Sequence, residues 1–294
     1  MMNIRAFIQM FIAMTIFGSV GFFSVLTGLP ALELVFIRCI CATVFLGIIW
    51  VVTGTYKKEQ WGKKELIRVS FCGIANLLNW IFLFKSFELI SITVAISLYH
   101  LAPMIVLLVG SFIFREKLTT LSVLAISVCF VGTIFIIGVD GDLSNASFQM
   151  TGFLYAILAA LFYALTMILG KSLQQISVYA TTFIQTALGA ICLLPFIHYH
   201  AFLDLTTLNW AYAIITGIIH TGVVYLLFFD SVRKLSTRTI SGMVFLDPAV
   251  AILLDVVIIG FRPSIIQTVG ILFIFIGMLY TLKKPKQENT ANYT

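Results

Sequence analysis

From Phe82 to Ile136 the chain reads FLFKSFELISITVAISLYHLAPMIVLLVGSFIFREKLTTLSVLAISVCFVGTIFI. From Leu227 to Thr281 it reads LFFDSVRKLSTRTISGMVFLDPAVAILLDVVIIGFRPSIIQTVGILFIFIGMLYT. The two stretches align without a gap at an offset of 248 − 103 = 145 residues, which the two prolines set. The same offset pairs identical residues along the whole stretch: Phe84 with Phe229, Ser86 with Ser231, Ser91 with Ser236, Leu101 with Leu246, Pro103 with Pro248 and Gly132 with Gly277.

This offset is close to half of the 294 residues, so the alignment predicts two halves, 1–145 and 146–294. The composition says what each half is made of. Hydrophobic residues make up 61% of the chain and charged residues only 10%, against about 45–50% and about 25% in ordinary soluble domains. Thirty charged side chains cannot cover a water-exposed surface of this size. The composition therefore excludes a soluble enzyme, a nucleic-acid-binding module, a disordered chain and a disulfide scaffold.

The apolar residues fall into segments long enough to cross a bilayer, which takes about 20 residues of helix. We expect an all-α polytopic membrane protein with ten transmembrane helices, five in each half. The expected spans are 4–26, 30–52, 66–86, 91–114, 119–139, 151–172, 178–202, 210–232, 238–259 and 264–282.

Because five is an odd number, the second half enters the membrane upside down relative to the first. The sequence thus predicts two inverted five-helix repeats around a central cavity, related by a pseudo-twofold axis in the membrane plane. Such a repeat supplies two near-equivalent arrangements, one open to each side. Alternating access is the function that this symmetry favours.

The basic residues predict the orientation, because Lys and Arg concentrate in cytoplasmic loops. With the N-terminus inside, the outer side carries only Lys85 and Arg262, and Arg38 lies within a span. Both termini are therefore expected in the cytoplasm. The inner side carries the other fifteen: Arg5, Lys57, Lys58, Lys63, Lys64, Arg68, Arg115, Lys117, Lys171, Arg233, Lys234, Arg238, Lys283, Lys284 and Lys286.

The runs LAPMIVLLVGSFIFREKLT and LDPAVAILLDVVIIG, with FIRCICA in the second expected span, resemble the EamA family of the drug/metabolite transporter (DMT) superfamily. The resemblance covers both halves. It implies a bacterial inner-membrane carrier, commonly an exporter of amino acids or related metabolites, with its cavity between the halves.

The same resemblance aligns particular residues. Arg38 matches an Arg of the family's second span, and Glu116 matches its Glu before the fifth. Asp247 stands where the family usually has Glu before Pro248. The family often repeats, in the second half, the Gly-Glu pair that it has around the position of Glu116. This chain has Phe261 there instead, so the two halves have diverged.

Asp247 lies about ten residues into the ninth expected span, near mid-membrane. An ionisable group at this depth is expensive and is by default a functional-site hypothesis. We expect it to bind a substrate ammonium or a proton; alternatively it stays protonated or bonds a neighbouring helix. Pro103 and Pro248 are expected to break their helices and free the carbonyls four residues earlier. Such paired breaks are typical of transporter binding sites, although a packing kink is the alternative.

Three further polar residues are candidates for the same site. His100 and His220 lie mid-span and have a side chain that exchanges protons near neutral pH, although each is equally consistent with a neutral interhelical hydrogen bond. Arg38 and Glu33 are expected to close an outer gate or to bind a substrate carboxylate. The alternative is structural pairing of Arg38 with Glu33 or with another helix, partly by snorkelling. Asp247 and His100 are the candidates for proton coupling.

Asn79, Trp80, Tyr99 and Tyr163 are candidates for the polar and aromatic walls of a substrate-binding cavity. The alternative for each aromatic is packing or lipid contact. Gly18, Gly21 and several alanines are expected to allow close helix approach.

Together these features predict a secondary transporter that moves a small polar metabolite, an amino acid or a related compound, outward by alternating access with proton coupling. The alternative is a membrane-embedded enzyme or a carrier acting on lipid-linked substrates, which the short, acid-poor loops disfavour. The chain has no G-x-x-x-x-G-K-[ST] motif and no metal-ligand cluster, so we expect no ATP, cofactor or metal. The expected partners are a small-molecule substrate and the lipid bilayer, without nucleic acid, and the expected state is a monomer or a homodimer.

Overall fold

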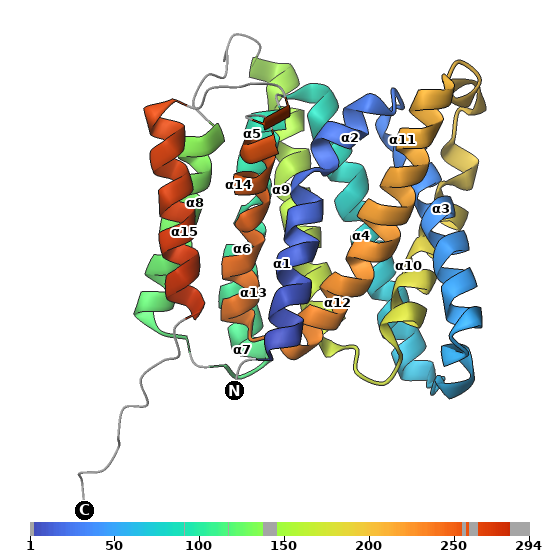
Figure 1. The fold of residues 1–294 in the computed structure, drawn as a ribbon, viewed down its shortest axis with the longest axis horizontal. Coiled ribbons are helices and arrows are strands. Elements are labelled where there is room, and N and C mark those ends of the chain that lie inside the picture. Colours follow the sequence, from blue (N-terminus) through green and yellow to red (C-terminus); the bar gives the residue numbers. More distant parts are fainter. Residues whose placement is uncertain are drawn as a thin grey trace, which may run out of the picture.

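The computed structural model consists of helices that run side by side up and down the molecule (Figure 1). It describes residues 3–90, 92–116, 118–137, 146–254, 257–258 and 264–282. Every regular element in these residues is helical, which confirms the all-α prediction. A helix satisfies its own backbone hydrogen bonds, as a chain in hydrocarbon must.

The α-helices of the first half of the chain are α1 (Ile4–Gly18), α2 (Val20–Leu26), α3 (Ala31–Val52), α4 (Lys63–Leu89), α5 (Ile92–Tyr99), α6 (Leu101–Ile105), α7 (Ser111–Ile113) and α8 (Thr120–Ile137). Those of the second half are α9 (Ala146–Ser172), α10 (Val178–Leu193), α11 (Thr207–Gly217), α12 (Val224–Lys234), α13 (Thr237–Val244), α14 (Leu246–Leu254) and α15 (Ile265–Leu282). Two π-helical segments, η2 (Val106–Gly110) and η5 (Ile218–Val223), join α6 to α7 and α11 to α12.

Six helices of the described residues are long and apolar enough to cross a membrane, and three shorter apolar helices accompany them. The protein is therefore a polytopic membrane protein by length and composition of its helices, while the described residues do not show ten full-length spans. The six are Ile4–Leu26, Ala31–Val52, Lys63–Leu89, Met150–Ser172, Val178–Phe196 and Thr207–Lys234, and the shorter three are Leu101–Ile113, Thr120–Phe135 and Ile265–Gly277.

The seventh expected span, 178–202, was predicted too long. α10 ends at Leu193, and two short 3₁₀ turns, Leu194–Phe196 and Tyr199–Phe202, follow it. Pro195 lacks the backbone N–H that would continue the helix, which explains why the helical run stops there although the sequence remains apolar.

The fourth and ninth expected spans are each interrupted by one residue, His100 between α5 and α6, and Phe245 between α13 and α14. Pro103 and Pro248 stand in the first turns of α6 and α14, where a missing N–H costs little. The His100 and Phe245 rings lie 5.6 Å apart. The two helix breaks therefore meet inside the protein.

α8 and α15 pack side by side at one end of the long axis, opposite α3 and α10 (Figure 1). Their bounds differ by 145 residues at both ends. A Cβ built on Gly277 would lie 2.4 Å from Cys129 Sγ and 2.6 Å from the Ala125 carbonyl oxygen. A Cβ on Gly132 would lie 2.7 Å from the Gly270 carbonyl oxygen. The two backbones thus approach so closely that only glycine fits at the crossing.

Replacing Gly277 with valine is expected to destabilise the protein by about 1–3 kcal/mol, because the added methyl groups would overlap the α8 backbone. The effect is measured as a lower midpoint of thermal unfolding in detergent. The matched control is Gly21→Ala, because nothing lies within 4 Å of a Cβ at Gly21. Gly18 packs on α14 as expected for a close approach, but Gly21 does not. An unchanged midpoint for Gly277→Val would contradict the tight crossing.

Candidate functional site

Arg38 is a buried cation held by a hydroxyl and two aromatic rings. It lies on α3 with 3% of its surface exposed, and its Nε donates to Thr221 Oγ1 at 3.0 Å. Its guanidinium carbon lies 5.6 Å from the centre of the Trp80 ring and 5.3 Å from that of Phe84. Among the described residues no carboxylate forms an ion pair with it, so the terminal nitrogens of Arg38 keep their capacity to bind an anion.

Of the two structural partners expected for Arg38, the structure shows a bond to another helix, through Thr221, and no ion pair with Glu33. Glu33 Oε1 instead accepts hydrogen bonds from the His198 backbone N at 3.0 Å and from His198 Nδ1 at 3.3 Å. Glu33 and Arg38 are five residues apart on one helix, which places them on different faces, whereas residues three or four apart are neighbours.

A chain of hydrogen bonds fixes the position of Trp80, whose ring contacts Arg38. Trp80 Nε1 donates to Tyr225 Oη at 2.6 Å, and Tyr225 Oη donates to Asn76 Oδ1 at 3.4 Å. Asn76 Nδ2 in turn donates to Gln185 Oε1 at 3.0 Å. These bonds connect α4, α12 and α10. They hold the Trp80 ring where it meets the guanidinium.

Tyr99 and Tyr163 form a stacked pair with ring centres 4.9 Å apart and planes 6° apart. His100 follows Tyr99 at the helix break and is 1% exposed. Its Nδ1 lies 2.8 Å from the Ile96 carbonyl oxygen, and its Nε2 has no hydrogen-bond partner among the described residues. A buried nitrogen without a partner costs free energy, which a ligand or a water would recover.

Asp247 lies in the first turn of α14 and is half-buried. Its carboxylate forms no hydrogen bond or ion pair with any described residue. The Tyr99 and Tyr163 hydroxyls are near enough to Asp247 to interact with its charge. Tyr99 is also near enough to interact with the charge of Arg38. Tyr99 therefore lies near both a buried cation and an acid that have no ion pair with a described residue.

Asn79 lies next to Trp80 on α4 and is completely buried. Neither its amide oxygen nor its amide nitrogen meets the geometry of a hydrogen bond with a described residue, although the Tyr99 hydroxyl is near. The side chain thus has one donor group and one acceptor that no described residue satisfies.

His220 lies in the π-helical segment η5, and its Nε2 lies 2.8 Å from Ser19 Oγ. Its ring centre is 5.0 Å from that of Phe23. This bond fits the alternative that His220 forms a neutral hydrogen bond between helices. The Nδ1 is buried without a partner in the described part of the chain, and Arg38 lies within electrostatic range.

The eight expected substrate-site residues lie near one another inside the helix bundle, and Tyr99 is near both Arg38 and Asp247. Sequence reasoning missed Ser19, Thr221 and Phe84 as their partners. A lone hydroxyl in an apolar span carries no periodic signal, and Phe84 is one of 27 phenylalanines. Within the described residues, no group of three or more His, Cys, Asp or Glu side chains could hold a metal ion.

The chain is similar to a family of transporters and to two proteins that carry the name of transporter. The model of the EamA-like transporter family matches residues 4–138 and again residues 150–283. The chain is 56% identical over 289 residues to "Uncharacterized transporter YxxF" of Bacillus subtilis (strain 168), covering 98% of this chain and 92% of that protein. It is 26% identical over 184 residues to an "Uncharacterized transporter" of Clostridium kluyveri (strain ATCC 8527 / DSM 555 / NBRC 12016 / NCIMB 10680 / K1), covering 60% and 59%.

A solved structure titled "Crystal structure of protein" shares the fold with a TM-score of 0.79 and 18% identity, covering 94% of this chain and 97% of that one. At this identity the likeness concerns the fold alone. The double family match and the names of the relatives point to transport across a membrane and away from an enzyme.

Proposed function

Because the chain belongs to the EamA-like transporter family, a family of the DMT superfamily, and is a membrane transporter, we propose that it exports a small zwitterionic metabolite, an amino acid or a related compound, by alternating access. The observation that carries the substrate class is that Arg38 and Asp247, a cation and an acid without an ion pair among the described residues, both lie near Tyr99. The carboxylate of the substrate would bind the guanidinium of Arg38, and its ammonium would bind the carboxylate of Asp247.

The proposal includes an inverted repeat, 1–145 and 146–294, with a pseudo-twofold axis between the halves. Three pairs of residues that are 145 apart touch each other, as they can only near such an axis: Trp80 with Tyr225, His100 with Phe245 and Cys129 with Ile274. In Figure 1, α5, α6 and α7 follow one another from top to bottom, whereas α13 and α14 follow from bottom to top. This opposite direction supports inversion.

We place the protein in a bacterial inner membrane with both termini in the cytoplasm. The fifteen Lys and Arg residues that this orientation puts inside support it, against two outside. Energy comes from an ion gradient, with proton exchange at Asp247 and His100, since the chain has no nucleotide-binding motif. The unit is a monomer or a homodimer.

A membrane-embedded enzyme is the weaker proposal. Such an enzyme needs a catalytic constellation at a membrane face, such as paired carboxylates with a metal. Arg38 and Asp247, which form no ion pair with a described residue, lie inside the helix bundle instead.

The test of the substrate class is a tolerance screen. A strain that overexpresses the protein is expected to grow at concentrations of one or more toxic amino acids or analogues that arrest a strain carrying the empty vector. Equal sensitivity to every compound in the panel would contradict export of this class.

Replacing His100 with alanine is expected to shift or flatten the pH dependence of transport, because the proposed proton exchange uses the imidazole at the helix break. The measurement is initial flux between pH 5.5 and 8.5 at constant membrane expression. His200→Ala, which removes an exposed imidazole from a loop, is the control and should leave the profile as it is. An unchanged profile for His100→Ala would make His100 structural.

A further inference from the structure

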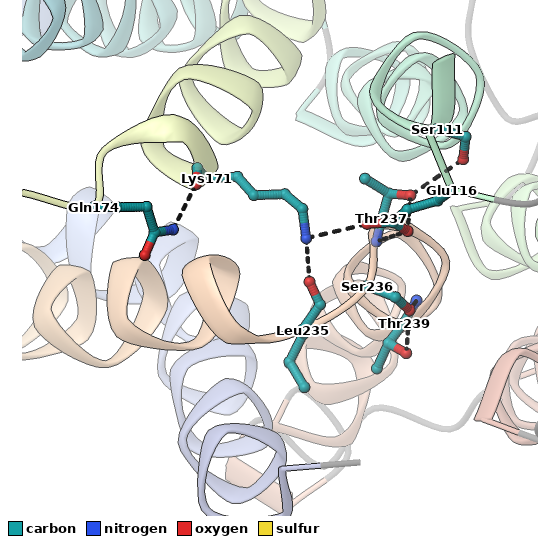
Figure 2. A network of polar contacts seen from close by, with 8 residues as sticks. All are labelled: Ser111, Glu116, Lys171, Gln174, Leu235, Ser236, Thr237 and Thr239. Carbon is teal, nitrogen blue, oxygen red and sulfur yellow. Dashed lines mark hydrogen bonds and ion pairs between the residues drawn. The ribbon is translucent and has the colours of Figure 1, made fainter. Parts of the chain in front are cut away.

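A polar network joins three segments at the end of the molecule where α13 begins (Figure 2). Glu116 Oε2 accepts from the Thr237 backbone N at 2.8 Å and from Thr237 Oγ1 at 2.6 Å. Lys171 Nζ lies 3.3 Å from Glu116 Oε1 and also donates to the Leu235 carbonyl oxygen. Ser111 Oγ lies 3.1 Å from Thr237 Oγ1. These five residues are called the Glu116 latch below.

The Glu116 latch crosses between the two halves of the chain. Ser111 and Glu116 come from the first half, while Lys171, Leu235 and Thr237 come from the second. The Glu116 carboxylate caps the N-terminus of α13, where a negative charge is favoured by the helix dipole. The Lys171 side chain is 12% exposed and that of Glu116 25%, so this charge pair is better shielded from water than a surface pair.

The repeat does not provide a second latch. At the offset of 145 residues, every latch position that contributes a polar side chain has an apolar counterpart in the other half. The counterparts are Val256 for Ser111, Phe261 for Glu116, Leu26 for Lys171 and Ile92 for Thr237. The positions that would act at the opposite end of an inverted repeat therefore carry no carboxylate, ammonium or hydroxyl.

We propose that the Glu116 latch keeps the transporter closed at the end of the molecule where α13 begins. Because the repeat-equivalent positions carry no such network, the empty transporter favours the state that is closed at this latch end. The inference rests on the proposed alternating-access function. In the state open at the latch end, α13 must separate from Glu116 and Lys171, and these contacts are lost. Contacts that exist in only one of two states shift the population toward that state.

The test measures which end of the protein is open, without needing a substrate. In a background with all five cysteines replaced (Cys39, Cys41, Cys72, Cys129 and Cys192), one reporter cysteine is introduced at a time. Ser241→Cys reports the latch end, because Ser241 is buried one turn beyond Thr237 on α13. Ser24→Cys reports the opposite end, because Ser24 is buried on α2. The rate of reaction with a small water-soluble maleimide is measured in nanodiscs, where both ends are accessible.

Glu116→Gln is expected to raise the reaction rate at the latch-end reporter about tenfold and to lower the rate at the opposite reporter. Tenfold is the effect of weakening a hydrogen bond to a charged group. Lys171→Met should act in the same direction. Glu65→Gln is the matched control, because the Glu65 carboxylate also accepts backbone hydrogen bonds, from Gln174 N and Gln175 N, but does not hold α13.

Unchanged rates at both reporters would overturn the latch. Faster reaction at both would overturn it as well, since the network would then hold the fold together and not one gate. Failure of the transport function itself is read separately, as absence of solute flux through the wild-type protein in proteoliposomes.

Discussion

Asp247→Asn is expected to reduce transport by roughly two orders of magnitude, the effect of losing a charge-assisted contact worth about 3 kcal/mol. The carboxylate has no ion pair or hydrogen bond with the described residues, so no structural partner is stranded by the change. What is lost is the charge that would meet a substrate ammonium or a proton. The measurement is initial flux of the substrate found in the tolerance screen, normalised to the amount of protein in the membrane.

Two further variants make the test of Asp247 specific. Asp247→Glu keeps the charge and introduces the residue that the EamA resemblance places before this proline, so it should retain flux. Asp204→Asn removes an exposed acid from a loop and should behave as the wild type. Wild-type flux in Asp247→Asn would exclude Asp247 from binding and coupling alike.

Arg38→Lys is expected to raise the KM for transport at least tenfold, while Arg38→Leu should lose saturable transport. The Thr221 bond and the Trp80 and Phe84 rings hold a planar guanidinium, leaving its terminal nitrogens for an anion. Lysine keeps the charge but has neither the planar fork nor its fixed orientation. The measurement is the concentration dependence of initial flux.

The control for Arg38 is Arg68→Leu. Arg68 is 55% exposed and lies 3.5 Å from Glu65, so its loss removes an equal charge from a surface pair. A normal KM in both Arg38 variants would show that Arg38 only stabilises the packing of α3 on the neighbouring helices.

Much of the architecture could be predicted because its signals are local. Apolar runs of bilayer length predict spanning helices, and the helix interruptions at His100 and Phe245 lie three residues before the two prolines that set the repeat. Trp80 and Tyr225 are also 145 residues apart, the offset of the repeat. That the two side chains are bonded could not be predicted, because contact between repeat equivalents depends on where the axis passes.

Other features of the site depend on the third dimension. Glu33 is near Arg38 in sequence, but the helical rotation over five residues turns it toward His198. Thr221 faces Arg38 from a helix 183 residues away, through a π-helical segment that composition does not reveal. The Glu116 latch likewise joins segments more than 50 residues apart, so the sequence singled out Glu116 but not the residues that it contacts.

The proposed function is secondary transport of a zwitterionic metabolite. The most direct measurement is counterflow in proteoliposomes loaded with an unlabelled amino-acid mixture, following entry of each labelled amino acid with and without a pH gradient. We expect saturable, protein-dependent entry of at least one of them, altered by the gradient and lost in Asp247→Asn. Entry equal to that of protein-free liposomes for every amino acid, under both conditions, would contradict it.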